Sequence, residues 1–100
     1  MIKHVVMWKF NEQAEGKSRE ENMSLIKERL TALKPNIPQL LSMEIGKDMG
    51  VGRDTYDMVL ITTFKDIDAL ELYQQHPEHK KVSEYVAKVR KARSCVDFQI

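Results

Sequence analysis

The side chains best suited to proton transfer gather in one short segment, residues 73–79, with the sequence Tyr-Gln-Gln-His-Pro-Glu-His. It contains a phenol, Tyr73, and two imidazoles, His76 and His79, while a third histidine, His4, stands near the start of the chain. Because the unperturbed pKa of histidine lies closest to physiological pH, a histidine in an apolar cavity can act as a general base. A tyrosine hydroxyl can donate a hydrogen bond to an oxyanion that forms during a reaction. The segment therefore predicts acid–base chemistry if Tyr73 and His79 face one interior space.

Helical patterns on either side of Pro77 decide which of these side chains point inward. Asp66 is a good N-cap for a first helix, whose apolar positions are Ile67, Leu70 and Tyr73. Pro77 suits the first turn of a second helix, and His79 shares its apolar stripe of Val82, Val86 and Val89. We therefore expect Tyr73 and His79 to point toward the core and His76 to cap or turn the chain. The helix dipole and partial burial favour a neutral imidazole at His79.

The remaining elements must supply the surface that these two helices cover. Alternating apolar residues predict strands over residues 2–10, 41–46, 56–64 and 94–100. Ser18 and Glu21 have the spacing of a capping box, and the helix that they begin ends before Pro35 and Pro38. The order is β-α-β-β-α-β, with the second helical region broken at Pro77. This order predicts an α+β fold, the ferredoxin-like split β-α-β arrangement of a four-stranded antiparallel sheet with helices on one face.

The central strands are apolar on both faces, which has a consequence for assembly. One face carries Val6, Trp8 and Leu60, and the other carries Val5, Met7, Val59 and Ile61. Right-handed crossovers place all helices on one side, so the second face would be a large exposed apolar patch on a monomer. A second copy of the sheet is the simplest cover. We therefore predict a homodimer through the sheet face, which makes a dimeric α/β barrel.

Composition bounds the class of protein. A chain of 100 residues predicts one domain, residues 1–100. The net charge of +1 argues against nucleic acid or an anionic membrane as the main partner. The chain has no apolar run of membrane-spanning length, and no signal peptide precedes the first strand. Its one cysteine, Cys95, excludes an intramolecular disulfide, so the reducing cytoplasm is the expected location.

We predict neither a metal nor a cofactor. His76 and His79 are three residues apart, but Pro77 breaks the helix that would align them, and Glu78 should face away. A lone cysteine leaves no cysteine-based metal site. Backbone carbonyls over residues 33–38 could hold a hard cation, which side chains alone cannot test.

Three sequence features together resemble the Dabb family of stress-responsive dimeric α/β-barrel proteins. They are the opening Met1-Ile2-Lys3-His4, the motif His76-Pro77-x-His79 and the closing Asp97-Phe98. The resemblance spans essentially the whole chain and implies two ferredoxin-like sheets paired face to face. Most members have no assigned reaction. Some plant members resemble stress-stability proteins, and one, olivetolic acid cyclase, closes a linear polyketide by an aldol reaction without a cofactor.

The resemblance to this cyclase implies roles for particular residues. Its catalytic tyrosine and histidine match Tyr73 and His79, and a histidine at its strand start matches His4. One departure stands on the third strand, where the cyclase has a histidine and this chain has Met58. The polar groups on that wall of the pocket therefore differ from those of the cyclase, and we do not expect this chain to use the plant substrate.

Three functions remain open. The first is a cofactor-independent lyase or cyclase for a small apolar carbonyl compound, in which His79 abstracts a proton, Tyr73 holds the oxyanion and His4 orients a polar group. Its cavity wall would be Val6, Trp8, Met58, Leu60 and Val82. The second is a non-catalytic, stress-related or ligand-binding dimer, in which the same residues fill the core. The third, more remote, is a cofactor-independent monooxygenase. A cavity touching Tyr73 and His79 favours the first, whereas a space filled by Trp8, Met58 and Phe98 excludes it.

Overall fold

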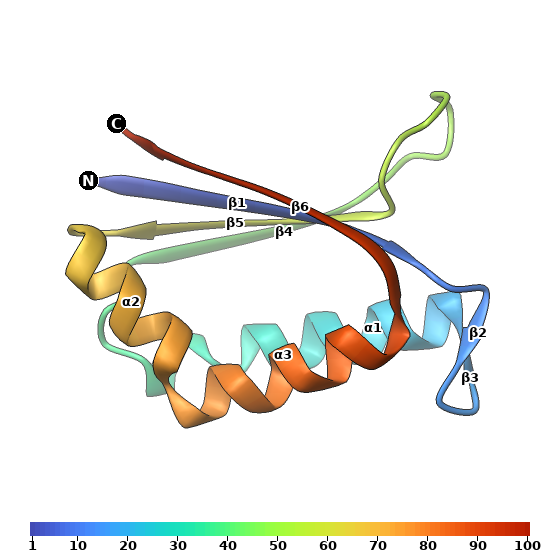
Figure 1. Cartoon of the computed structure of the whole chain (residues 1–100), viewed down its shortest axis with the longest axis horizontal. Coiled ribbons are helices and arrows are strands. Elements are labelled where there is room, and N and C mark those ends of the chain that lie inside the picture. Colours follow the sequence, from blue (N-terminus) through green and yellow to red (C-terminus); the bar gives the residue numbers. More distant parts are fainter.

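The computed structural model describes residues 1–100, and it has the predicted ferredoxin-like α+β architecture (Figure 1). In chain order the elements are β1 (Ile2–Phe10), β2 (Gln13–Ala14), β3 (Lys17–Ser18), α1 (Arg19–Thr31), a 3₁₀ turn (Lys34–Asn36), β4 (Ser42–Lys47), β5 (Met58–Phe64), α2 (Ile67–Gln75), α3 (Pro77–Val89) and β6 (Arg90–Gln99). The main sheet is antiparallel with the order β4-β5-β1-β6, and the three α-helices lie on one side of it. No helix is long and apolar enough to cross a membrane.

Local hydrogen bonds explain where the helices begin. Ser18 and Glu21 form the predicted capping box at the start of α1. The Asp66 carboxylate accepts a hydrogen bond from the backbone N–H of Ala69 at the start of α2. The His76 ring does the same for α3, since its Nδ1 accepts from the backbone N–H of Glu78 at 3.1 Å. The capping role predicted for His76 is confirmed.

Three local predictions differ from the structure. The short hairpin of β2 and β3 was not predicted. Its turn consists of Glu15 and Gly16, which both have positive φ. Glutamate is rare in such a turn, so the sequence contains no hairpin signal. Ile67 is 61% exposed and does not join the buried stripe of α2. The last strand begins at Arg90, not at Ser94, directly after α3. The first residues of this strand are mostly basic and show no apolar alternation. They can still form a strand, because a strand at the edge of a sheet tolerates charge.

The two faces of the sheet differ in their surroundings. On the helix side, β1 contributes His4, Val6 and Trp8, all buried, and these pair with Thr62, Leu60 and Met58 of β5. The other side carries Val5, Met7, Val59, Ile61, Val96 and Phe98, which are half-buried or exposed. Phe98 pairs with Lys3 on this outer face and is 43% exposed. The idea that Phe98 could fill the space under the helices is therefore wrong.

Candidate functional site

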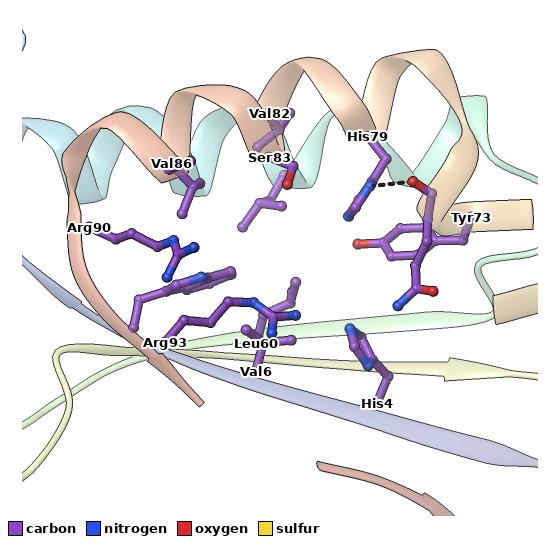
Figure 2. Close-up of a pocket in the computed structure, with 14 residues that line it drawn as sticks. His4, Val6, Leu60, Tyr73, His79, Val82, Ser83, Val86, Arg90 and Arg93 are labelled. Atoms are coloured by element: carbon purple, nitrogen blue, oxygen red, sulfur yellow. Dashed lines mark hydrogen bonds between the residues drawn. The ribbon is translucent and has the colours of Figure 1, made fainter. Parts of the chain in front are cut away.

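A cavity of about 260 Å³ lies between the helices and the inner face of the sheet (Figure 2). It is lined by His4, Val6, Trp8, Leu30, Leu60, Tyr73, Gln74, His79, Val82, Ser83, Val86, Ala87, Arg90 and Arg93. Every site residue predicted from sequence is among them except Met58. Met58 is buried at the start of β5, opposite Trp8, and the Trp8 ring forms part of the wall without closing the space.

Tyr73 has a buried hydroxyl group without a hydrogen-bond partner. It sits in the last turn of α2 and is fully buried, with its ring 4.9 Å from that of Phe64 and 4.4 Å from that of His79. Its hydroxyl is the one buried side-chain polar atom with no hydrogen-bond partner. An unpartnered buried hydroxyl destabilises a fold, so natural proteins rarely keep one without a function. Burial raises the pKa of Tyr73 far above its usual value, so the hydroxyl keeps its proton and remains a donor.

His79 stands in the first turn of α3, next to the Tyr73 ring. Its Nδ1 lies 3.2 Å from the backbone carbonyl of Gln74 (Figure 2). Because a carbonyl oxygen only accepts, Nδ1 carries the hydrogen, which leaves a lone pair on Nε2 of the neutral ring. Burial lowers the pKa of His79, and the nearby charges of His4, Arg93 and His76 act in the same direction against the Gln74 hydrogen bond. The ring is therefore neutral at physiological pH, with a basic nitrogen available.

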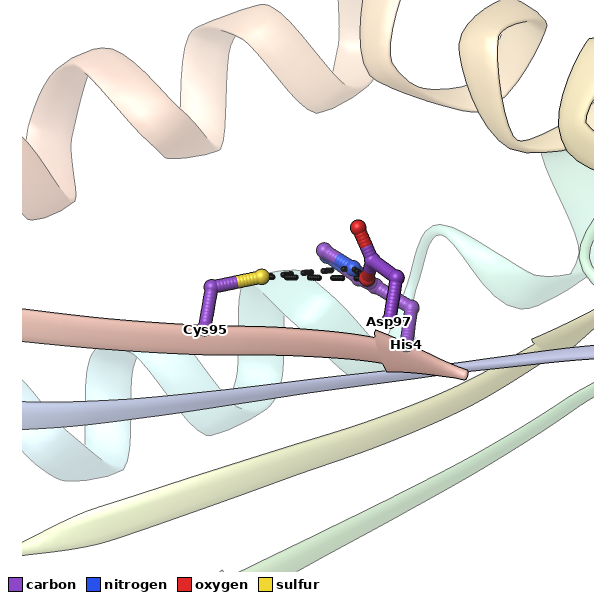
Figure 3. A group of neighbouring side chains, drawn as sticks. All are labelled: His4, Cys95 and Asp97. Atoms are coloured by element: carbon purple, nitrogen blue, oxygen red, sulfur yellow. Dashed lines mark hydrogen bonds and ion pairs between the residues drawn. The ribbon is translucent and has the colours of Figure 1, made fainter. Parts of the chain in front are cut away.

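His4 enters the cavity from the sheet and is oriented by the neighbouring edge strand. Its register partner on β6 is Asp97, and Nδ1 of His4 donates to the Asp97 carboxylate (Figure 3). His4 is buried, whereas the Asp97 side chain is 43% exposed. A carboxylate on one ring nitrogen fixes the tautomer and the direction of the other nitrogen. In both histidines that line the cavity an acceptor holds Nδ1: the Gln74 carbonyl for His79 and the Asp97 carboxylate for His4.

The same corner contains the donor atoms best placed for a metal ion. Cys95 Sγ lies 3.6 Å from Nδ1 of His4 and 3.7 Å from Oδ1 of Asp97, and all three atoms lie within 4.8 Å of one another (Figure 3). Sulfur, imidazole and carboxylate donors together suit a divalent transition metal. The sequence analysis considered His76, His79 and Cys95 and missed this mixed set, because His4 and Asp97 approach Cys95 only through the pairing of β1 with β6. Burial and the Asp97 carboxylate raise the pKa of Cys95, which keeps its thiol protonated.

Sequence reasoning also missed Arg90 and Arg93 of β6, which both line the cavity. The alternation of the last strand was recognised only from Ser94 onward, so neither arginine was placed on a strand. The register shows why both matter: Arg93 pairs with Trp8 and Arg90 pairs with Phe10, which puts them on the helix side of the sheet.

The fold and the family model together identify the chain. The model of the stress-responsive A/B barrel domain, Dabb, matches residues 2–100. The chain belongs to the Dabb family. No curated protein matches it.

Three solved structures have the same fold as this Dabb chain. A dimeric ferredoxin-like protein of unknown function from Bacteroides fragilis is 27% identical, with a TM-score of 0.81 over 99% of this chain and 95% of the other. The hydroxynitrile lyase of Passiflora edulis is 14% identical, with a TM-score of 0.85 over 99% and 92% of the two chains. An antibiotic biosynthesis monooxygenase is 15% identical, with a TM-score of 0.72 over 100% and 98%. The two enzymes share the fold with this chain and show nothing further about its chemistry.

Proposed function

We propose that this Dabb protein is a homodimeric, cofactor-independent lyase or cyclase that acts on a small, largely apolar carbonyl compound. The observation that carries the proposal is the fully buried Tyr73 hydroxyl, which has no partner in the protein and lines the same cavity as a neutral His79. A donor and a base directed at one apolar space are what the removal of a proton next to a carbonyl group requires.

In the proposed reaction each residue has one task. Nε2 of His79 takes a proton from the carbon next to the substrate carbonyl, and the electron pair of that C–H bond moves onto the carbonyl oxygen. Tyr73 donates a hydrogen bond to this oxyanion. The enolate carbon then attacks a second carbonyl, forming a C–C bond, and His79 returns the proton to the new alkoxide. In the lyase direction the same steps run backward. His4, held by Asp97, orients a polar group of the substrate.

Val6, Trp8, Leu60 and Val82 supply the apolar wall in this proposal. A low-polarity wall strengthens the hydrogen bond from Tyr73 to the developing charge, because water does not compete for it. Met58 does not line the cavity. The difference at this position, methionine here and histidine in the plant cyclase, therefore has no direct effect on the cavity wall.

Self-association is the second part of the proposal. It rests on the apolar outer face of the sheet, which includes Val59, Ile61 and Val96, and on the dimeric state of the Bacteroides relative. His4, Tyr73 and His79, the polar residues of the proposed reaction, all line the cavity of a single chain, and the outer face of the sheet is left for the second copy. The reducing cytoplasm remains the proposed location, in keeping with the unpaired Cys95.

The test does not require the natural substrate. A panel of linear and cyclic methyl ketones and β-diketones is incubated with the protein in D₂O, and exchange at the carbon next to the carbonyl is followed by NMR. The expected result is catalysed exchange of at least one class, lost in His79→Ala with little change in melting temperature. His76→Asn is the matched control, because asparagine keeps the helix cap while removing an imidazole outside the cavity. A large melting loss in His79→Ala with unaffected ligand binding would place His79 in the structural core.

The alternative is a non-catalytic binding or stress-related dimer, favoured by the apolar wall between the two polar ends of the cavity. Ligand binding without exchange by any member of the panel supports this alternative. The remote alternative, a cofactor-independent monooxygenase, predicts oxygen uptake with hydroquinone-like compounds, and no uptake across a broad panel counts against it.

A further inference from the structure

Two guanidinium groups line the cavity away from Tyr73 and His79. Figure 2 shows Arg90 at the end farthest from the tyrosine and histidine, while the Arg93 side chain reaches the middle of the space near Val6 and Leu60. Arg93 is exposed, so this side of the cavity meets the solvent, and Arg90 is half-buried at the junction of α3 and β6. The cavity therefore has a cationic side, formed by Arg90 and Arg93, and an acid–base end, formed by Tyr73 and His79.

Neither arginine has a negatively charged partner in the protein. The chain contains four ion pairs, and they join other residues: His4–Asp97, Arg19–Asp57, Lys47–Glu20 and Lys81–Glu78. The two cation–π contacts involve Lys9 and Arg29. The Arg93 guanidinium lies within hydrogen-bond reach of the Cys95 thiol, which occupies at most one of its five donors. The remaining donors of both guanidinium groups are thus free for a ligand.

The wall between the two ends is apolar, with Val6, Trp8, Leu60, Val82 and Val86. Guanidinium groups match the geometry of carboxylates and phosphates, which they bind through two parallel hydrogen bonds. A ligand complementary to the whole cavity would have an oxoanion at one end, an apolar body and a carbonyl oxygen at the other. An apolar cavity of about 150 Å³ holds benzene, so a volume of about 260 Å³ suits a molecule of roughly ten to fifteen non-hydrogen atoms.

We propose that the substrate is an amphipathic oxoanion, a keto acid or the phosphate ester of a ketone, whose anionic group binds Arg90 and Arg93 while its carbonyl oxygen reaches Tyr73. The anion site follows from two guanidinium groups that line the cavity without a carboxylate partner. The keto group rests on the proposed function. The length of the apolar body sets which carbon lies next to His79, so the arginines select the position of the reaction along the chain. Arg93 also acts on His79 through its charge, and a bound anion offsets this effect.

Binding is measured with simple probes that cannot react. Trp8 is the only tryptophan and lines the cavity, so its fluorescence reports occupancy. The probes are nonanoate, nonyl phosphate and nonan-1-ol, which share one apolar body. We expect either anion to bind about tenfold or more tighter than the alcohol, as for hydrogen bonds to charged groups. The stronger of the two anions identifies the natural oxoanion. Equal binding of the alcohol and both anions would overturn the proposal.

Variants assign the effect to the two arginines. Arg90→Gln and Arg93→Gln should each weaken anion binding about tenfold and leave the binding of nonan-1-ol unchanged. Lys91→Gln is the matched control, since Lys91 lies between them on β6, is exposed and does not line the cavity. Arg93→Lys separates charge from the planar fork and is expected to recover only part of the affinity. If both Arg→Gln variants keep full affinity while folded, the anion site is wrong.

The readouts keep the two proposals apart. Anion binding that depends on the arginines, without exchange of any ketone, would leave the site standing and remove the enzyme. Ketone exchange that depends on His79, without preference for anions, would do the reverse. NMR titration adds a positional check: nonanoate should raise the pKa of His79 by offsetting Arg93, while the charges of His4 and His76 also act on this ring. Nonan-1-ol should not produce this rise, and a rise of equal size would contradict the placement of the anion.

Discussion

The two faces of the sheet carry similar apolar side chains, but those on the inner face are buried and those on the outer face are partly exposed. On β5, Leu60 points toward the helices and is buried, while its neighbours Val59 and Ile61 point the other way and remain partly exposed. The inner face is closed by the chain itself, which leaves one cavity with all its functional groups. The outer face is closed by nothing in this chain. The proposed chemistry and the proposed dimer interface therefore depend on alternate residues of the same strands, and substitutions can test them independently.

The largest effect is expected from Val59→Lys on the outer face. A charged side chain at the centre of the proposed dimer interface cannot be paired there, so the protein should unfold or aggregate. Circular dichroism and light scattering after size exclusion measure this. Leu72→Lys is the control, because Leu72 is an exposed leucine on α2, away from the sheet. A folded, soluble Val59→Lys monomer would disprove the interface.

Leu60→Ala tests the inner face and should lower the free energy of unfolding by about 2–5 kcal/mol, as for other buried leucines. Ile61→Ala, one residue along the strand, should cost less in a monomer, and its cost should depend on protein concentration because it weakens the dimer. Urea unfolding at two protein concentrations distinguishes the pair. Equal, concentration-independent losses would contradict the division between the two faces.

Tyr73→Phe should separate activity from stability within the inner face. Removal of the donor is expected to slow ketone exchange about 10²–10³-fold. The free energy of unfolding should stay the same or rise, because the lost hydroxyl has no partner. Tyr85→Phe is the converse control: the Tyr85 hydroxyl donates to Asn22, so its loss should cost about 1 kcal/mol of stability and no activity.

The pH dependence should follow His79. Its pKa in the fold is lowered from 6.5 by burial, so exchange should persist below pH 6.5 and fall at lower pH as the ring is protonated. Stability should also fall as the pH is lowered. Below pH 6.5 the unfolded state binds a proton at His79 and the folded state does not, so the free energy of unfolding decreases until the pH reaches the folded-state pKa. Activity profiles and urea unfolding at several pH values measure both, and His79→Gln should reduce the slope. An activity loss that begins above pH 6.5 would contradict a neutral buried base.

The smallest effect is expected at the corner of His4, Cys95 and Asp97. If His4 only orients substrate, Cys95→Ser and treatment with a chelator should each leave ketone exchange unchanged. Asp97→Asn should slow it, because the amide no longer fixes the His4 ring as a carboxylate does. A loss of exchange on chelation, restored by zinc, would mean that the three donors hold a metal.

Local chemistry made much of this fold predictable. Ser18, Asp66 and Pro77 mark helix starts because their hydrogen-bonding or backbone constraints act within three residues. Tyr73 and His79 could be assigned to the core for a similar reason, since helical periodicity is local. It could not show whether they would line an open cavity, which depends on how closely the helices pack against the sheet.

What escaped prediction depends on register between distant strands. The pairing of His4 with Asp97, the approach of Cys95 and the inward direction of Arg90 and Arg93 all follow from the alignment of β1 with β6. The outward direction of Phe98 has the same origin. Alternation along a strand gives two sets of residues, and only the neighbouring strand decides which set meets the helices.

Because β1 and β6 are the first and last strands, their pairing also means that the site can form only at the end of synthesis. A ribosome releases β6 after every other element described here, and until then one long edge of β1 has no partner. His4 is among the first residues made, yet it waits for Asp97, 93 positions later. A prematurely terminated chain can thus keep its helices and most of its sheet while lacking the carboxylate that orients His4, both cavity arginines and the strand that covers the edge of β1. Such a fragment would be inactive and prone to pair with other strands, which makes it a natural client for chaperones and proteases.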